Sequence, residues 1–464
     1  MSKDNVQNES VETALYKKRE KIYPREVHGI FATLRNTAMV VLLGIFYGMP
    51  WLSYEGHQAI LFDLPARKFY IFGWTFWPQD FIYLTALLLI AAYALFFFTA
   101  LAGRLWCGYA CPQTVWTEIF LWMERKIEGT RQKQIKLDKQ TLNAEKFMRK
   151  AGKHSAWLIF SLFTGFTFVG WFTPIDSLYS DIITGNISAW GVFWILFYGF
   201  ATYGNAGWMR EQVCIYMCPY ARFQSAMFDK DTLLIAYDEQ RGEPRGARKK
   251  NSEETEDLGS CIDCKLCVQV CPTGIDIRDG LQYQCIGCAA CVDVCDDVME
   301  KTGQPKGLVK YTTENELNGI KTHVFRPRIV IYALLLIAIT GGLVYSVATR
   351  VPLIIDVLRD RSSLFIETDE GYIENVYTLK IINMSNDPQT YRLSASGIEG
   401  LVLQNSMGEF SVESGGVAEV PVRLTADPGN LKSASSQVNF TVESLTTEDL
   451  TVTEHGRFLG PLSR

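Results

Sequence analysis

Eight cysteines lie close together in the second half of the chain and form two groups with the same spacing. The first group has the spacing C-x2-C-x2-C-x3-C-P and consists of Cys261, Cys264, Cys267 and Cys271, followed by Pro272. The second group repeats the cysteine spacing and consists of Cys285, Cys288, Cys291 and Cys295. Three closely spaced thiolates can hold three corners of an iron–sulfur cubane, while the fourth reaches a neighbouring cluster. This spacing predicts a two-cluster ferredoxin module that holds two [4Fe–4S] clusters.

The predicted ligand sets cross between the two groups, because the turn after the third thiol carries the fourth away. One cluster is expected on Cys261, Cys264, Cys267 and Cys295. The other cluster is expected on Cys285, Cys288, Cys291 and Cys271. A zinc site is the alternative, but zinc sites usually separate two Cys-x2-Cys pairs more widely and need four ligands rather than eight.

Cys295 departs from the ferredoxin pattern, since Asp296 and Asp297 follow it in place of proline. Two carboxylates beside a cluster ligand disfavour an added electron. The sequence therefore predicts a lowered reduction potential for the cluster bound by Cys295.

The other four cysteines form two matching pairs, each with the spacing Cys-x3-Cys-Pro. One pair is Cys107 and Cys111 in WCGYACPQ, and the other is Cys214 and Cys218 in VCIYMCPY. On a helix, thiols four residues apart share one face. Two such pairs brought together supply four soft ligands, which suit Cu(I) or an iron–sulfur centre. Buried structural cysteines and a reversible disulfide are the alternatives.

Other side chains give weaker indications of chemistry. Met123, Met209 and Met217 lie near the cysteine pairs in the sequence. Packing is the favoured role for them, because methionine is more often a packing residue than a Cu(I) ligand. His57, Asp63 and Asp80 are expected to be solvated or hydrogen-bonded rather than to bind a metal or transfer a proton. The sequence has no Cys-x-x-Cys-His motif, so covalent c-type haem is not supported.

All twelve cysteines lie between Cys107 and Cys295, and the last 169 residues contain none. A secreted disulfide protein would scatter its cysteines, so this distribution indicates metal or redox chemistry in a reducing compartment. The first thirty residues are polar and basic without an apolar core, so no cleavable signal peptide is expected. No nucleic-acid partner is expected.

Long apolar stretches must position these cysteines at a membrane. A helix needs about 20 apolar residues to cross the hydrocarbon core. Five stretches qualify, at residues 34–52, 80–102, 154–173, 188–208 and 328–349. The sequence therefore predicts a multi-domain membrane protein with a bundle of five transmembrane helices.

The basic residues predict the orientation of this bundle, because loops rich in Lys and Arg stay in the cytoplasm. Seven Lys and Arg precede residue 36, and eleven lie at 103–153, whereas 53–79 holds two and 174–187 none. The N-terminus and every cysteine are thus expected on the cytoplasmic side. After five crossings, the acidic tail is expected outside.

The expected domains follow from these features. A cytoplasmic arm (1–33) precedes a region of four transmembrane helices (34–236), a charged linker (237–259), an α+β ferredoxin module (260–325) and a fifth helix (326–349). Runs such as YTLKIINM and QVNFTVES in the tail alternate apolar with polar residues between turn residues. Residues 350–464 are therefore expected to form an all-β sandwich.

The chain resembles the cytochrome c oxidase accessory proteins of the CcoG/FixG/RdxA type over nearly its whole length. The resemblance rests on LFDLPARKFYIFGWTFWPQDF, GRLWCGYACPQTVWTEIFLWMERKIEG, REQVCIYMCPYARFQSAMFDKDTLLIAYDEQRGEPRG and the double ferredoxin motif. It implies a bacterial inner-membrane protein, with an immunoglobulin-like tail (350–464) in the periplasm, that is needed to assemble cbb3-type cytochrome oxidase. It also implies cupric reductase activity, with Cu(II) as substrate and copper-handling proteins as partners.

Three functions follow as hypotheses. The favoured one is an oxidoreductase in which electrons pass from the two clusters to the membrane-face pairs, Cys107, Cys111, Cys214 and Cys218, and reduce Cu(II). The second is a quinol-linked electron conduit, and the third is a non-catalytic scaffold for oxidase assembly. Reduction of the clusters by quinol would favour the conduit.

Overall fold

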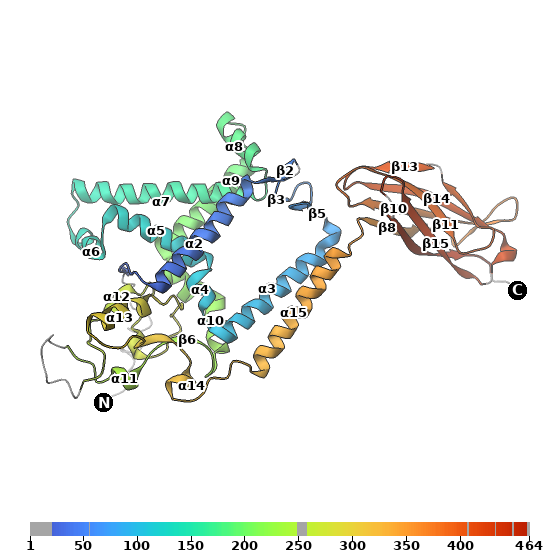
Figure 1. Cartoon of the computed structure of the whole chain (residues 1–464). Helices are drawn as coiled ribbons and strands as arrows, with labels where there is room; N and C mark the ends of the chain where they lie inside the picture. The colour runs from blue at the N-terminus through green and yellow to red at the C-terminus, as the bar shows by residue number, and fades with distance from the viewer. Residues whose placement is uncertain are drawn as a thin grey trace, which may run out of the picture. The chain divides into compact units, whose positions relative to one another are not determined.

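The computed structural model describes residues 21–54, 56–247, 258–405, 408–431, 433–447 and 450–461. The chain divides into two compact units, each formed by two separate segments (Figure 1). One unit consists of Met1–Trp51 and Ile90–Ile337, and the other of Leu52–Leu89 and Ala338–Arg464. Most of the expected N-terminal arm and the middle of the charged linker lie outside the described residues.

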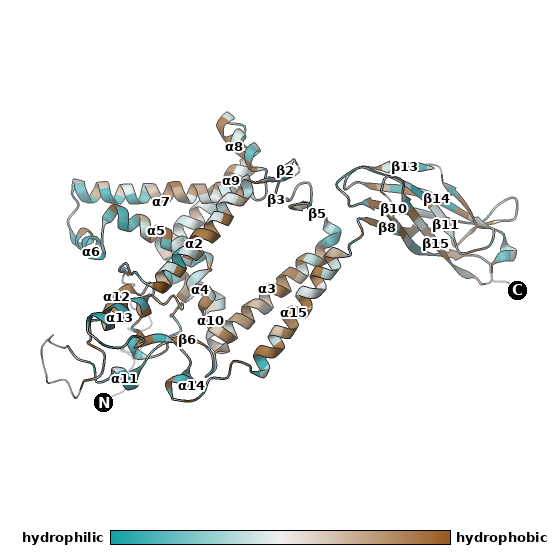
Figure 2. Cartoon of the chain, viewed as in Figure 1, coloured by the Kyte–Doolittle hydropathy of each residue, from teal (hydrophilic) through white to brown (hydrophobic). Residues whose placement is uncertain are grey.

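Among the residues that the structure describes, three helices are by themselves long and apolar enough to cross a membrane. The first is α2 (Ile30–Gly48), which continues into the short 3-10 helix η1 (Met49–Trp51). The second is α3 (Phe81–Ala102), preceded by η2 (Pro78–Asp80), and the third is α15 (Pro327–Ala348). Their apolar side chains are largely unburied, which suits contact with lipid (Figure 2). These helices match three of the five predicted spans.

The other two predicted spans take different forms, so the count of five is not confirmed. Residues 154–173 belong to a longer helix, α7 (Ala144–Gly170), whose N-terminal part is polar. Residues 188–208 form α9 (Ala189–Thr202) and the π-helix η3 (Tyr203–Met209). Helix α8 (Ile175–Thr184) and the α9–η3 helix reach the length and hydropathy of a span only together, with a bend of 104° between them.

Helices α7 and α9 pack against each other through glycines. A Cβ on Gly165 would lie 2.2 Å from the Ile195 carbonyl oxygen, and one on Gly199 would lie 3.3 Å from the Ser161 carbonyl oxygen. Close backbone approach at small residues is how helices associate where lipid removes the hydrophobic driving force. The pair therefore forms a fixed wall beside the cysteine-bearing turns.

The membrane-face cysteines lie on short helical turns. After α3, the chain forms α4 (Leu105–Tyr109), α5 (Pro112–Glu128) and α6 (Arg131–Lys139). After η3, it forms a second π-helix, η4 (Val213–Met217), and α10 (Pro219–Met227). The two stretches therefore repeat one arrangement, a short turn followed by a helix that begins at proline.

The ferredoxin module is built from short elements around the two cysteine motifs. They are β6 (Leu234–Tyr237), α11 (Glu239–Gly242), α12 (Leu266–Val270), η5 (Ile277–Asp279), α13 (Ala290–Lys301), β7 (Val309–Thr312) and α14 (Glu314–Leu317). Strands β6 and β7 pair antiparallel, with Leu234 opposite Thr312. Strand β6 precedes the expected linker and β7 follows it, so their pairing closes the module.

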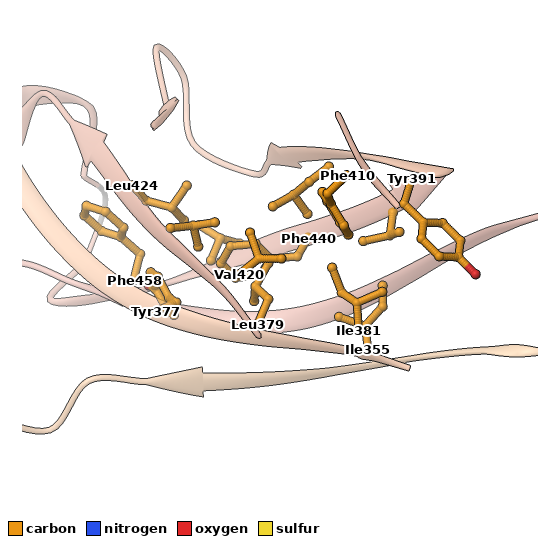
Figure 3. Close-up of a cluster of buried hydrophobic side chains, with 14 of the residues drawn as sticks. Ile355, Tyr377, Leu379, Ile381, Tyr391, Phe410, Val420, Leu424, Phe440 and Phe458 are labelled. Atoms are coloured by element: carbon orange, nitrogen blue, oxygen red, sulfur yellow. The ribbon is translucent and has the colours of Figure 1, made fainter. Parts of the chain in front are cut away.

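The second unit contains a β-sandwich. One sheet has the order β12–β14–β10–β8, with β9 paired to β10, and the other has the order β13–β11–β15–β16. The strands are β8 (Leu353–Arg359), β9 (Ile366–Glu367), β10 (Ile373–Asn383), β11 (Gln389–Ser396), β12 (Val402–Asn405), β13 (Glu409–Val412), β14 (Val417–Ala426), β15 (Ser435–Ser444) and β16 (Thr451–Leu459), with η6 (Pro428–Asn430) between β14 and β15. Figure 3 shows the core between the sheets, where Tyr377, Phe440 and Phe458 are fully buried. The expected all-β tail is confirmed.

The loop between α2 and α3 belongs to the same unit as the sandwich. It forms β1 (Ser53–Tyr54), β2 (His57–Gln58), β3 (Ile60–Asp63), β4 (Lys68–Ile71) and β5 (Trp74–Phe76). Trp77 follows β5 and packs in a small apolar cluster with Ile382 and Met384 of the sandwich. Arg350 fixes the next turn, because its guanidinium contacts the Asp80 carboxylate at 2.5 Å. The loop thus has a defined structure, which the sequence analysis missed.

Candidate iron–sulfur and thiol site

Two small cavities gather the eight ferredoxin cysteines into two sets. The first cavity is lined by Cys261, Cys264, Cys267 and Cys295, and the second by Cys271, Cys285, Cys288 and Cys291. Each set takes three cysteines from one motif and the fourth from the other, as the crossed assignment predicts. Cys267 also reaches the wall of the second cavity. Apolar side chains form most of the remaining lining, so the donor set and its surroundings fit a [4Fe–4S] cluster in each cavity.

The backbone turns that wrap each cavity are alike in the two motifs. Asp263 and Lys265 have left-handed φ angles of 51° and 55° in the first motif. Gly287 and Ala289 have φ angles of 69° and 56° at the equivalent places in the second. A left-handed residue on each side of the second cysteine reverses the chain, which turns successive thiols toward one point. The repeated spacing in the sequence therefore corresponds to a repeated local structure.

Burial shifts the ionisation of the cluster thiols. Desolvation raises the pKa of Cys288 and of Cys295 to about 12, and that of Cys285 to about 11. Iron binds the thiolate form, so cluster insertion must release protons from these side chains. In the first cavity, Asp296 adds to the raised pKa of Cys295 through its negative charge.

The second cluster motif is held against the first membrane helix. Asp293 of α13 accepts hydrogen bonds from the backbone N–H groups of Phe31 (3.1 Å) and Ala32 (2.7 Å). These are free donors in the first turn of α2, which Gly29 cannot cap with a side chain. A carboxylate also interacts favourably with the positive end of a helix dipole. Asp293 therefore joins the ferredoxin module to the start of the first span.

The four membrane-face cysteines occupy equivalent local positions in pairs. Cys111 is the N-cap of α5 and Cys218 the N-cap of α10, and in each case proline occupies the first helical turn. An arginine precedes each turn, Arg104 before α4 and Arg210 before η4, and both are buried. The structure therefore shows a repeated motif of arginine, two cysteines and proline.

The four thiols lie near one another. Burial raises the pKa of Cys107 to about 12, and a negative charge on Cys111 or Cys214 adds to this rise. Cys111 and Cys218 act in the same way on Cys214, whose pKa burial raises to about 11. Within the described residues, no three His, Cys, Asp or Glu side chains form a site for a single metal ion. Binding of one copper ion by all four thiols would therefore require the thiols to move closer together.

The first of these turns packs directly on the second cluster motif. A Cβ on Gly108 would lie 2.8 Å from the Gly287 carbonyl oxygen and 2.9 Å from the Cys288 Cα atom, so only glycine fits. Arg104 donates hydrogen bonds to the carbonyl oxygens of Tyr283 and Cys285. Consequently the backbone of the Cys107 turn touches the backbone that carries Cys285 and Cys288. Sequence reasoning missed both Gly108 and Arg104.

A buried ion network holds the second turn. The Arg210 guanidinium contacts the Glu124 carboxylate at 2.7 Å, and Lys153 contacts both Glu124 (3.4 Å) and Glu128 (2.9 Å). Burial would raise the pKa of Glu124, but Arg210, Lys21 and Lys153 lower it to about 2. Arg210 itself has a φ of 44° between the two π-helices. Glu124 thereby fixes a strained residue just before Cys214.

The remaining sequence candidates have structural roles. His57 stacks on Tyr70 with ring centroids 4.7 Å apart, and Asp63 accepts a hydrogen bond from the Ala66 N–H at 2.9 Å. Met123 packs with Phe120 and Trp157, while Met217 is exposed. Asp80 pairs with Arg350, as described above. None of these contacts adds a ligand to the cysteine sites.

Comparison with known proteins identifies the family of the chain. Residues 209–314 match a family model described as a 4Fe-4S dicluster domain, residues 84–129 a 4Fe-4S binding domain, and residues 343–461 an IG-like fold at the C-terminus of FixG. Protein RdxB of Cereibacter sphaeroides is 41% identical over 405 residues, which cover 84% of this chain and 85% of RdxB. The chain belongs to the FixG/RdxA family.

Two further relatives have similar coverage. Protein RdxA of Cereibacter sphaeroides is 39% identical over 90% of this chain and 91% of its own length. The nitrogen fixation protein FixG of Rhizobium meliloti is 35% identical over 86% of this chain and 84% of FixG. Membership of the FixG/RdxA family makes this chain a membrane iron–sulfur protein of the double-cluster ferredoxin type. The family model of a 4Fe-4S binding domain, which matches residues 84–129, also includes the first membrane-face pair, Cys107 and Cys111.

Proposed function

We propose that this protein is a membrane-bound oxidoreductase that reduces Cu(II) to Cu(I) for assembly of a cbb3-type cytochrome c oxidase. The observation that carries the proposal is the contact between Gly108 and the backbone of Gly287 and Cys288. It joins a turn that carries soft thiol ligands to the wall of a cluster cavity. Thiolates favour Cu(I) over Cu(II), so binding by cysteine pulls the reaction toward the reduced ion.

In the proposed reaction, one electron converts one Cu(II) to Cu(I). When bound, the two [4Fe–4S] clusters supply single electrons. The residues of the chain fix the distance between donor and acceptor, through Gly108 and the hydrogen bonds of Arg104. Cys107 and Cys111 receive the copper ion together with Cys214 and Cys218 of the second turn. The cavity lined by Cys285 and Cys288 is the one nearer the copper.

The proposed placement in the cell follows the charge pattern of the loops. The N-terminus, the ferredoxin module and all four membrane-face cysteines lie on the cytoplasmic side of a bacterial inner membrane. The sandwich lies in the periplasm, where oxidase assembly proteins and copper-handling proteins are its proposed partners. Cysteine-rich chemistry then stays in the reducing compartment.

The test uses anaerobically purified protein, reduced until the iron–sulfur absorbance bleaches. Cu(II) is then added with a Cu(I)-specific chelator, and Cu(I) formation and cluster reoxidation are followed together. The proposal expects one Cu(I) for each electron that leaves a cluster. It also expects that replacing Cys107 and Cys214 with serine lowers the rate while the iron content stays unchanged. Clusters that stay reduced in the presence of Cu(II) would contradict copper reduction.

A further inference from the structure

A large cavity lies between the first membrane helix and the second cluster motif. Its volume is about 430 Å³, within the range of small-ligand sites in proteins. Helices α2 and α5 form two of its walls. Pro272, at the end of the first cysteine motif, and Cys288 of the second motif form a third. Its lining includes Met39, Leu121 and Trp122 as apolar residues and His28, Arg35 and Glu118 as polar ones. We call it the α2–α5 cavity.

The α2–α5 cavity reaches both redox sites. Cys288, which lines the second cluster cavity, also lines this one, and so does Cys214 of the membrane-face turns. Arg35 lines it as well, and its guanidinium donates a hydrogen bond to the Cys288 carbonyl oxygen. A molecule bound here would lie beside a predicted cluster ligand. Such a place suits an electron donor.

The position of the cavity indicates a ligand that dissolves in lipid. From Ala32 to Met39, its wall follows α2 for about 10 Å along a helix that can cross a membrane. The Arg35 guanidinium can donate hydrogen bonds to a carbonyl or phenolate oxygen, while it disfavours a metal cation. Trp122 and Leu121 supply flat and apolar surface. An aromatic head group with ring oxygens fits this combination.

The chemistry of the acceptor narrows the class of donor further. A [4Fe–4S] cluster takes up one electron at a time, whereas a nicotinamide delivers a hydride and needs another cofactor to split the electron pair. A quinol can release its two electrons singly. It is also the lipid-soluble class of donor with two ring oxygens. The cavity therefore fits a quinol in its position, its polarity and its chemistry.

We propose that the α2–α5 cavity binds the head group of a membrane quinol, which is the electron donor of this protein. The inference rests on the proposed oxidoreductase function and names the donor for it. The quinol is oxidised to the quinone and gives up two electrons and two protons. When bound, the two clusters would take up one electron each, while the exposed His28 of the cavity lining passes the two protons to water. One quinol therefore supports the reduction of two Cu(II) ions.

The test fills the cavity from α2 without touching a cysteine. Met39→Trp adds bulk to a half-buried residue that lines the cavity. Val40→Trp adds an even larger group at the next position, where the side chain is 66% exposed and does not line it. Met39→Leu controls for loss of the methionine. Each holoprotein is mixed anaerobically with decylubiquinol while cluster bleaching is followed, and is separately photolabelled with an azidoquinone for peptide mapping.

The proposal expects bleaching of the wild-type clusters and labelling of peptides from α2 or α5. Both signals should fall at least about tenfold in Met39→Trp, the equivalent of ~1.4 kcal/mol of lost quinol binding, and stay at the wild-type level in the two controls. Wild-type bleaching in Met39→Trp, or labels only outside α2 and α5, would overturn it. Dithionite-reduced protein is also mixed with Cu(II). A failure of that reaction contradicts copper reduction and leaves the quinol site standing.

Discussion

Single cysteines decide which iron–sulfur cluster each motif can complete. The first cavity takes Cys295 from the second motif, and the second takes Cys271 from the first. A change at either residue should therefore affect the cluster of the opposite motif. Neighbouring charges then shift the reduction potentials of the clusters that form.

We predict that Cys295→Ser removes the cluster bound by Cys261, Cys264 and Cys267 and spares the other. Cys271→Ser should do the reverse. Each variant should retain about half of the iron, because each loses one thiolate ligand of one cubane. Electron paramagnetic resonance of the reduced variants would show two different single-cluster spectra. Identical spectra from the two variants would contradict the crossed assignment.

We predict that Asp296→Asn raises the potential of the cluster bound by Cys295. Asp296 accepts a hydrogen bond from the Gly307 N–H at 2.8 Å, and asparagine keeps that acceptor while it removes the charge. Loss of one nearby charge should shift the potential upward by about 40 mV, the equivalent of ~1 kcal/mol. Asp297→Asn is the control, because Asp297 is exposed and already paired with Lys301. A redox titration that ranks Asp297→Asn above Asp296→Asn would contradict this explanation.

At the scale of elements, buried charges and glycines determine how the helices meet. Glu124 connects α5 with Lys153 of α7 and with Arg210 beside η3. Gly108 brings α4 into contact with the cluster motif. Each contact couples a cysteine-bearing turn to a different part of the fold.

We predict that Glu124→Gln destabilises the protein by about 3–5 kcal/mol, because the buried Arg210 would lose its carboxylate partner and Lys153 would keep only Glu128. The surface variant Glu145→Gln is the matched control. It breaks the exposed ion pair with Arg149, for which a loss below ~1 kcal/mol is expected. Thermal unfolding in detergent at neutral pH compares the two variants. Equal transition temperatures would show that the buried network does not stabilise the fold.

We predict that Gly108→Ala separates the Cys107 turn from the second cluster motif. A Cβ there lies under 3.0 Å from backbone atoms, so the backbone must move, at a cost of about 1–3 kcal/mol. Iron content should stay at the wild-type level while Cu(I) formation slows. Gly44→Ala in α2, where a Cβ meets nothing within 4 Å, should leave both unchanged. Hydrogen exchange at residues 104–111 would detect the displacement, and unchanged exchange would exclude it.

The sequence predicted the features that depend on local spacing and missed those that depend on distant contacts. Cysteine spacing predicted the sets that line the two cavities, and strand alternation predicted the sandwich. Nothing near Gly108 or Asp293 in the chain shows that these residues contact Cys288 or α2. The predicted count of five spans is not confirmed, because α7 begins as a polar helix and the α8–α9 segment bends. Arginine before each Cys-x3-Cys-Pro turn was the signal available for Arg104 and Arg210.

At the scale of the whole molecule, two compact units alternate along one chain. Residues 52–89 and 338–464 form one unit, and the segments between them form most of the other. Helices α3 and α15 connect the two. The proposed topology concerns one domain of each unit, with the ferredoxin module in the cytoplasm and the sandwich in the periplasm.

We predict that protease added to spheroplasts digests the sandwich and leaves the ferredoxin module intact. Antibodies against tags at the two termini would identify the fragments. Protease added after the membrane is permeabilised should also digest the ferredoxin module. Digestion of the ferredoxin module in intact spheroplasts would reverse the proposed orientation.

The attachment of the ferredoxin module has a kinetic consequence. A soluble ferredoxin must find its acceptor by collision, so its transfer rate rises with concentration and falls when salt screens the encounter. Here the β6–β7 pair, the Gly108 contact and the Arg104 hydrogen bonds hold the cluster motif beside the Cys107 turn in the same chain. In the proposed reaction, transfer between them would therefore be a first-order step. We expect its rate to be independent of protein concentration and nearly insensitive to ionic strength.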